Sequence, residues 1–371
     1  MGLEEIAQVL YFVKLKEMNK CFINGVGCVS AQQTTEEGFL INPIDYLESN
    51  MIDVVKPEYK AFIPPAAIRR MSSSVKNSVV ASQLAINEAG IKDVAAIITG
   101  TGLGCIGDSE KFLNKLIDDN EEYLTPTSFI QSTHNTVAGQ IALGLQCKSY
   151  NFTYVNGGAS FPSALLDGLM KIQEGENGVL VGGMDELSSV TNQLYQKVHH
   201  YKQKDEIHGN ILHERSKGCV PSEGAAFFVL ENEKKENSYA ELIDVTYVNE
   251  LDKGGVSTFL NSFLKQNNVE MNDLDLIVLG NNGDVDYDTF YDEVESLTPS
   301  ISKVYFKHVF GEFMTSNAIG LWVASNILKT NSIPEVLLKD KTQNSPKELK
   351  RILFYNQYRG KDHSLILLQN V

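Results

Sequence analysis

The feature that most constrains the fold is a regular alternation of long apolar runs with amphipathic segments, which occurs twice along the chain. The apolar runs of the first half predict strands at about 21–30, 94–100, 151–156, 178–184 and 225–232. The amphipathic segments between them predict helices at about 75–89, 137–145 and 162–174. Gly90 and Gly175 follow two of these segments, as expected of helix ends. The order of elements is therefore βαβαβαββ.

The second half repeats this order from about residue 240. Its expected strands lie at about 240–248, 274–280, 303–306, 351–358 and 364–371, and its expected helices at about 256–267, 289–297 and 316–329. Near-continuous apolar strands are typical of sheets that helices cover on both faces. We therefore expect an α/β fold with an N-terminal extension at 1–17 and two related halves, 18–237 and 238–371, stacked in five α-β-α-β-α layers.

Charge and composition restrict the partners and the compartment. The 371 residues include 32 basic and 47 acidic side chains, and the net charge of −15 argues against binding to nucleic acid. No apolar run reaches the roughly 18 residues of a membrane helix. Glu4 and Glu5 stand where a secretory signal carries basic residues, and the five cysteines are scattered and odd in number. We expect a cytoplasmic protein with buried thiols and no membrane span.

Several short motifs then follow one another in a recognisable order. They are Ile23–Ser30 (INGVGCVS), Arg69-Arg70-Met71, Gly100–Gly104 (GTGLG), Gly182–Glu186 (GGMDE), Ser222–Ala226 (SEGAA) and Lys307. In order and spacing they resemble the β-ketoacyl-acyl-carrier-protein synthases of the thiolase-like superfamily, from about residue 21 to residue 368. The resemblance implies a thiolase-like fold of duplicated βαβαβαββ halves and an acyl-transfer site at the carboxyl ends of the strands.

The residues that carry out catalysis in this family are replaced. Active members use a cysteine at a strand-to-helix elbow as the acyl acceptor, but counting back from Gly175 places Gly158 there, and counting back from Gly183 places Gly157 there. The first of two histidines that stabilise an enolate is Asn282, which can still donate a hydrogen bond. The second, five residues after Lys307, is Glu312, whose carboxylate would repel an enolate.

The family contains chain-length factors, which resemble a synthase, lack its cysteine and shape the acyl tunnel in a heterodimer. The resemblance therefore implies a catalytically impaired synthase homologue that pairs with an active ketosynthase, or with itself, and receives acyl groups from an acyl carrier protein. The segment Gln131–Thr136 (QSTHNT) points to the aryl-polyene and flexirubin pigment clusters. The alternatives are an altered acyl-thioester enzyme, such as a decarboxylase or acyltransferase using Asn282 and Glu312, and a homodimeric acyl- or lipid-binding protein.

Four further residues are candidates for the acyl pocket. Ser160 and Phe161 follow the elbow, and Tyr358 lies where the family has a Phe-Gly-Phe-Gly-Gly gating loop. The sequence around Ser160 is close to Gly-x-Ser-x-Gly, which would make His134 the base of a serine nucleophile. The alternative, which we favour, is that the Ser160 hydroxyl caps the following helix.

Three other patterns have competing interpretations. Gly102–Gly107 (GLGCIG) formally matches a dinucleotide fingerprint, but its strand is the second of the fold and acidic residues follow it, so we expect no nucleotide cofactor. The excursion at 187–223 is expected to be a lid or a partner-facing loop. It contains four histidines, His199, His200, His208 and His213. Their spacing fits no known metal site, so we expect no metal. Its basic residues, which could attract an acidic carrier protein, are Lys197, Lys202, Lys204, Arg215 and Lys217.

Overall fold

A computed structural model describes residues 19–35, 38–46, 49–122, 126–207, 209–252, 254–339 and 348–371. The predicted N-terminal extension at 1–17 lies outside these ranges. The strands of the first half are β1 (Phe22–Val29), β2 (Ala96–Gly100), β3 (Tyr150–Tyr154), β4 (Val179–Asp185) and β5 (Gly224–Glu231). Its helices at the expected places are α3 (Ser73–Ala89), α6 (Thr136–Leu145) and α7 (Ser160–Gln173).

The second half contains the same succession of elements. Its strands are β6 (Ala240–Glu250), β7 (Leu276–Leu279), β8 (Ser302–Tyr305), β9 (Arg351–Tyr358) and β10 (Lys361–Gln369). Its main helices are α9 (Gly255–Gln266), α10 (Thr289–Leu297) and α12 (Asn317–Thr330). All of them lie within a few residues of their predicted positions, because the apolar periodicity that predicts them is the one that tertiary packing uses.

The strand order shows that the two halves have the same topology. The order β3-β2-β4-β5-β1 in one half corresponds strand by strand to β8-β7-β9-β10-β6 in the other. In each half the first three strands of this order are parallel, and the last two join antiparallel. The halves meet where β1 pairs with β6 through Phe22–Glu241 and Ile23–Ala240, so the ten strands are hydrogen-bonded in one continuous order. The five strands of the first half are called the first sheet below, and those of the second half the second sheet.

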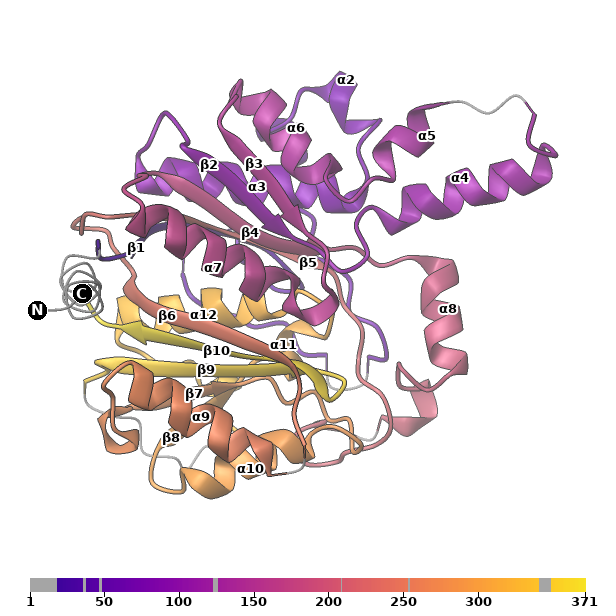
Figure 1. The fold of residues 1–371 in the computed structure, drawn as a ribbon. Helices are drawn as coiled ribbons and strands as arrows, with labels where there is room; N and C mark the ends of the chain where they lie inside the picture. The colour runs from indigo at the N-terminus through magenta and orange to yellow at the C-terminus, as the bar shows by residue number, and fades with distance from the viewer. Residues whose placement is uncertain are drawn as a thin grey trace, which may run out of the picture.

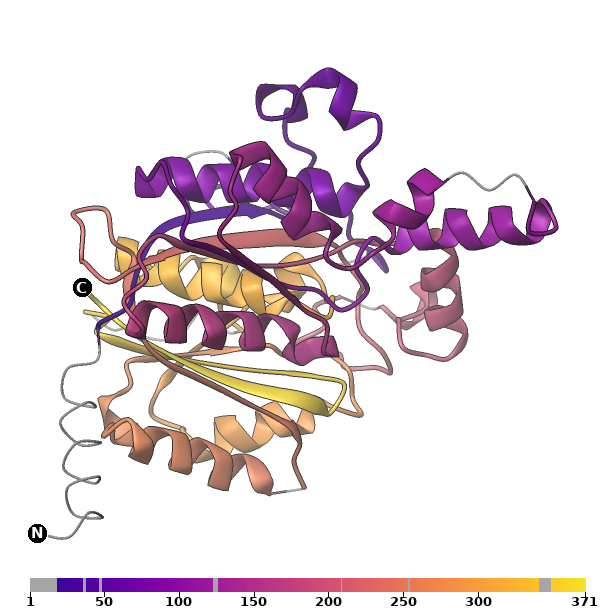
Figure 2. The same ribbon diagram turned by 45° about the horizontal axis from the view of Figure 1, so that its top comes forward.

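Five layers are visible in Figures 1 and 2, which confirms the predicted thiolase-like architecture. Helices α3 and α6 cover the first sheet, α9 and α10 cover the second, and α7 and α12 lie between the sheets. Residues Asn317 to Leu328 of α12 are all buried, as expected of a helix with a sheet on each side. The largest cluster of buried apolar residues includes residues of this middle layer and of both sheets.

The motif at Ile23–Ser30 has a packing role in this architecture. A Cβ atom on Gly25 or Gly27 would collide with the backbone of α3, at Ala85 and Ala81 respectively. Glycine at these two positions of β1 therefore allows the helix to lie directly against the strand, where a side chain would push the two layers apart.

Several elements have no counterpart among the sequence predictions. They are α2 (Pro65–Ile68), α4 (Ile106–Asp118), α5 (Pro126–Gln131), α8 (Ser189–Lys197) and α11 (Lys307–Phe310). Helices α4 and α5 contact each other and project from the body of the protein (Figure 1). None of the helices in the described ranges is long and apolar enough to cross a bilayer.

Candidate functional site

The elbow after β3 is a tight turn that leaves no room for a side chain. Residues Gly157–Ala159 form a single 3-10 turn between β3 and α7, with Gly157 in the left-handed region at φ +55°. A Cβ atom on Gly158 would lie 2.6 Å from Cβ of Tyr358 and 3.2 Å from Cβ of Asp362. Even the smallest side chain at Gly158 therefore requires the segment that carries Tyr358 to move.

The cysteines lie elsewhere. Cys21, Cys28, Cys105 and Cys219 are buried, Cys147 is partly buried, and none forms a disulfide. Burial raises the pKa of the Cys28 thiol to about 12 and, as the largest of several causes, that of Cys105 to about 12. A thiol in such surroundings stays protonated near neutral pH and is a poor nucleophile.

The structure corrects the prediction that Ser160 caps the following helix. Ser160 is the first residue of α7, and the preceding Ala159 provides the N-cap without a side-chain hydrogen bond. The Ser160 hydroxyl instead points back into the elbow, where it donates to the carbonyl of Gly157 at 2.8 Å and accepts from the N–H of Asn156 at 2.7 Å. The hydroxyl therefore stabilises the turn that precedes the helix.

The other pocket candidates are not gathered around Ser160. His134 is exposed and its ring lies against Gly104, where an added Cβ atom would be 3.0 Å from His134 Cδ2. Phe161 is fully buried in the core, and its ring centroid is 5.9 Å from that of Phe228. Tyr358 is the candidate that the structure brings to the elbow, through the contact of its Cβ with Gly158.

Asn282, Lys307 and Glu312 form one buried hydrogen-bonded cluster. Glu312 Oε2 accepts from Lys307 Nζ at 2.6 Å and from Asn282 Nδ2 at 2.8 Å. Its other oxygen accepts from the hydroxyl of Ser316 at 2.7 Å. The ammonium and carboxylate are both almost fully buried, so this is an internal ion pair supported by two neutral donors.

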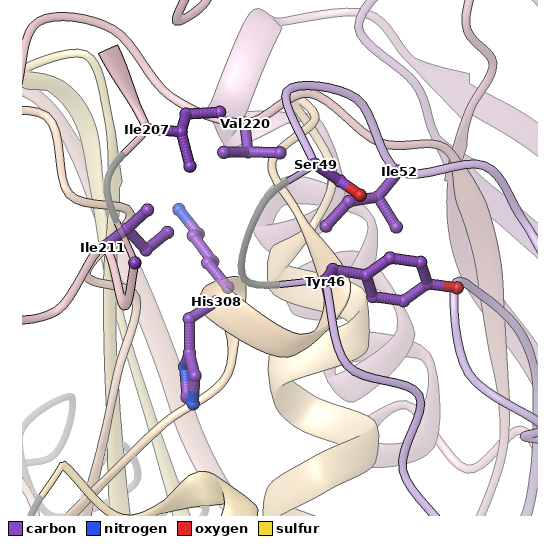
Figure 3. Close-up of a pocket in the computed structure, with 9 residues that line it drawn as sticks. Tyr46, Ser49, Ile52, Ile207, Ile211, Val220 and His308 are labelled. Carbon is purple, nitrogen blue, oxygen red and sulfur yellow. The ribbon is translucent and has the colours of Figure 1, made fainter. Parts of the chain in front are cut away.

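Lys307 is one of the residues that line a small pocket, most of whose other side chains are labelled in Figure 3. Its walls include Tyr46 and Ile52 from the segment before α2, and Ile207, Ile211 and Val220 from the excursion at 187–223. The methylene groups of a lysine pack well against such side chains while its ammonium reaches a polar partner. The excursion thus forms part of the wall beside Lys307.

The loop that carries Asn282 is fixed by further buried charges. Asp288 accepts from the N–H groups of Asn282 at 3.2 Å and Gly283 at 3.0 Å, and it pairs with Arg215 at 3.4 Å. Burial raises the pKa of Asp288 to about 6, although Arg215 and the two N–H groups oppose this rise.

Two of the five basic residues in the excursion are unavailable to a carrier protein. Arg215 donates two hydrogen bonds of 2.7 Å to Asp292. Lys202 is fully buried and donates to the carbonyl and hydroxyl of Ser216 and to the carbonyl of Gly283, at 2.8–2.9 Å. The expectation of a five-residue docking cluster is therefore wrong for these two side chains.

The glycine-rich loop after β2 uses its N–H groups within the protein. Buried Asp185 accepts five hydrogen bonds of 2.9–3.1 Å, from the N–H groups of Gly102, Leu103 and Thr315 and from the hydroxyls of Thr101 and Thr315. Glu186 accepts from the N–H of Gly107 at 2.9 Å. Carboxylates thus occupy donors that a dinucleotide fingerprint would turn toward phosphate.

The described histidines of the excursion, His199, His200 and His213, do not form a metal-binding group. His199 approaches Glu206 at 3.9 Å and His213 bonds to the carbonyl of Lys339 at 3.1 Å, while His208 lies outside the described residues. Within the part of the chain that the structure describes, no group of three or more His, Cys, Asp or Glu side chains is arranged to hold a metal ion.

At the place where the resemblance implies hydrogen-bond donors, Glu312 presents a carboxylate that accepts hydrogen bonds. An ionised carboxylate has no hydrogen to donate to an oxyanion. Asn282 has an amide that could donate, but one of its hydrogens is used by Glu312.

The sequence did not indicate two further residues of the site. Ser316 donates to Glu312, and the amide of Asn317 donates to the carbonyl of Gly158 at 3.0 Å. Both lie at the start of an apolar helix, where they look like ordinary caps.

Comparisons with known proteins show the family and the fold of this chain. The family model described as "Beta-ketoacyl synthase, N-terminal domain" matches residues 51–236, half of the chain. A comparison with curated proteins found no match. The structure of the ishigamide ketosynthase/chain length factor is similar with a TM-score of 0.78 at 17% identity, covering 95% of this chain and 100% of that chain.

Two more solved structures show the same fold. A β-ketoacyl synthase from Burkholderia phymatum has a TM-score of 0.76 at 18% identity, covering 95% of this chain and 100% of that chain. A ketosynthase in complex with its chain length factor, from Xenorhabdus doucetiae, has a TM-score of 0.71 at 14% identity, covering 95% of this chain and 98% of that chain. From the matched family model and the shared fold, this chain belongs to the β-ketoacyl synthase family.

Proposed function

We propose that this chain is a non-condensing ketosynthase homologue that acts as the chain-length-factor-like partner of an active ketosynthase, in fatty acid, polyketide or aryl-polyene biosynthesis. The observation that carries the proposal is the elbow at Gly158, which has no thiol and no space for one beside Tyr358. Without a covalent acyl acceptor, the chain has no group on which to hold a growing acyl chain during condensation.

The cluster around Glu312 supports the same proposal. Loss of one oxyanion donor costs roughly a hundredfold to a thousandfold in rate, and here a carboxylate has replaced a donor altogether. Lys307 and Asn282 hold this carboxylate in place, so it cannot simply turn aside for a substrate. Condensation by this chain alone would therefore lack both the nucleophile and the stabilised enolate.

A partner surface is available at the edge of the first sheet. Strand β3 is an edge strand, and Phe152 in its centre is 45% exposed. Other exposed apolar residues lie on β3, just after it and on the neighbouring helices α6 and α7: Tyr150, Val155, Leu143 and Met170. An exposed apolar edge strand tends to pair with another chain. The neighbour from Xenorhabdus doucetiae is itself a complex of a ketosynthase with its chain length factor.

The altered-chemistry alternative has less support than the partner role. It requires Asn282 and Glu312 to act on a carrier-bound acyl group, but these side chains bond to each other at 2.8 Å.

The homodimer alternative uses the same exposed edge of β3 as the heterodimer does. A measurement of which assembly forms therefore separates the heterodimer from the homodimer.

The proposal is tested by co-expressing the chain with a cysteine-bearing ketosynthase encoded beside it. We expect one copy of each chain in the complex by native mass spectrometry, and products whose length changes when this chain is present. Phe152→Lys should prevent assembly, whereas Leu297→Lys should not, because Leu297 is similarly exposed (37%) but lies on α10 in the outer layer of the other half. Elongation of a primer by the purified chain alone would overturn the proposal.

A further inference from the structure

The elbow has a hydrogen-bond donor that the proposed function leaves unexplained. The N–H of Gly158 lies one turn before α7, where the helix dipole favours an electron-rich acceptor. In this chain it donates to Oδ2 of Asp362 at 2.9 Å. The carbonyl of Gly158 is also held, by the amide of Asn317 at 3.0 Å. Both backbone groups of the residue at the nucleophile position are therefore bonded to side chains from the other half of the protein.

Asp362 reaches the elbow from the tip of the β9–β10 hairpin. Hydrogen bonds hold this tip, residues 357–362: Gln357 is fully buried, and its side chain accepts from the N–H of Gly360 at 2.6 Å and donates to the carbonyl of Tyr287 at 3.3 Å. Arg359 stacks over the ring of Tyr287, with its guanidinium carbon 5.1 Å from the ring centroid. The Asp362 carboxylate is thus presented by a braced turn.

The backbone of this tip is held in a costly conformation. Arg359 and Asp362 have φ values of +53° and +51°, in the left-handed region that residues other than glycine seldom adopt. Such conformations persist only where surrounding contacts determine them, and they cluster at functional sites. At Asp362, the second residue of β10, the conformation brings the carboxylate onto the elbow, and Tyr358, the last residue of β9, fills the adjoining space.

The environment of the carboxylate agrees with this role. Burial raises the pKa of Asp362, and the N–H groups of Gly158 and Ala159 and the ammonium of Lys361 lower it. The side chain is half-buried, so its charge is balanced mainly by the elbow donors and by an exposed lysine.

We propose that the Asp362 carboxylate occupies the position at which the carbonyl oxygen of an acyl thioester would accept a hydrogen bond from Gly158, so that the hairpin tip closes the acyl site from within the molecule. The inference rests on the proposed function, because it explains how a chain without a nucleophile also keeps acyl groups away from its own elbow. Asp362 is a positioning residue here and takes part in no reaction.

The inference is tested on the isolated chain with Asp362→Ala and the matched variant Asp362→Asn. Hydrogen–deuterium exchange is measured for the segment 155–162, with and without a probe. The probe is an octanoyl-pantetheine analogue in which an NH group replaces the thioester sulfur, so that it cannot transfer its acyl group. We expect slow exchange in the wild-type protein, unaffected by the probe. The Asp362→Asn variant retains an acceptor oxygen, so hydrogen–deuterium exchange at its elbow should remain slow. Asp362→Ala should exchange at least tenfold faster at the elbow, and the probe should restore the protection.

Two outcomes overturn the inference. If the elbow of Asp362→Ala exchanges as slowly as that of the wild type, another group holds the Gly158 N–H. If its exchange is fast but the probe restores nothing, Asp362 is a structural cap and does not stand in for an acyl group.

If Asp362→Ala does not fold, the inference is tested by a pH titration of the wild-type protein followed by NMR. Its Gly158 amide resonance must titrate together with Asp362, whose pKa lies above the usual range of an aspartate, and an amide that does not titrate overturns the inference. Partner binding is measured separately by co-expression, so a chain that binds no ketosynthase would refute the proposed function without changing these results.

Discussion

Replacement of Glu312 by glutamine is the most direct test of the buried cluster. The new side chain could keep its amide oxygen at the position of Oε2, where it would still accept from Lys307 and Asn282, and its NH2 group could donate to the hydroxyl of Ser316. The change thus removes the negative charge and preserves the number of hydrogen bonds. What remains is the ammonium of Lys307, buried without a counter-charge.

Removing one partner of a buried ion pair costs about 3 to 5 kcal/mol, because the other charge stays desolvated. We expect this loss in the free energy of unfolding for Glu312→Gln and for Lys307→Met alone. The double variant removes both charges and should be more stable than either single variant, since the desolvation penalty disappears with the charges. The exposed pair of Glu250 and Lys361, 2.8 Å apart, provides the control, and Glu250→Gln should leave stability unchanged.

The single tryptophan, Trp322, provides the assay. It is buried in α12, ten residues after Glu312, and packs edge-on against Phe39 and Phe310. Urea unfolding followed by its fluorescence reports on the helix that the cluster anchors. A loss below about 1 kcal/mol for Glu312→Gln, or a double variant weaker than both single variants, would refute the view that an ion pair organises this site.

Three further predictions follow from the same structure. The pKa of Asp288 in the folded protein is about 6, so between pH of about 4 and 6 the folded protein keeps a proton that the unfolded chain has lost. The contribution of Asp288 to stability therefore falls as the pH rises through this range. Asp288→Asn should flatten this pH dependence of the free energy of unfolding, measured in urea. Asp185→Asn should destabilise the protein by about 3 to 6 kcal/mol, because an amide NH2 would face two or more of the five donors. Gly158→Cys should neither condense nor become acylated by acyl thioesters in intact-protein mass spectrometry, because Tyr358 fills the space and Glu312 remains; robust condensation would contradict this.

The fold was predictable because its core elements are apolar with a clear period. Helix α3 ends at Gly90 with φ +66°, as its sequence indicates, and α12 is buried on every side from Asn317 to Leu328 because it lies between two sheets. Helices α4 and α8 have no counterpart among the predicted elements, although the apolar residues Phe112, Leu113, Leu116 and Ile117 of α4 recur at helical spacing. Asp108 is the buried residue of α4, whereas Leu113 and Ile117 face solvent, so this helix contributes little to the core.

The candidate site was predictable only where a replaced residue stands at a known spacing. Gly158, Asn282 and Glu312 could be found by counting from neighbouring motifs. Asp362 could not, because its partner is 204 residues away in the sequence and an aspartate in a hairpin turn is ordinary. Ser160 was misassigned because a serine before an apolar segment is typical of an N-cap, and only the geometry shows that the helix already begins there.

The replacements at this site satisfy one another, and this bears on how the chain could change. Asn282 donates to Glu312, Glu312 pairs with Lys307, and Asp362 takes up the donor at Gly158. Restoring a histidine at position 312 alone would leave Lys307 and Asn282 without their acceptor, and restoring a cysteine at position 158 alone would meet Tyr358. Each of these single substitutions lowers stability without restoring condensation, because a buried polar group left without its partner is penalised by about 1 to 3 kcal/mol. Under the proposed non-condensing role, a change to condensation therefore requires several coordinated substitutions, because the buried groups of this site satisfy one another.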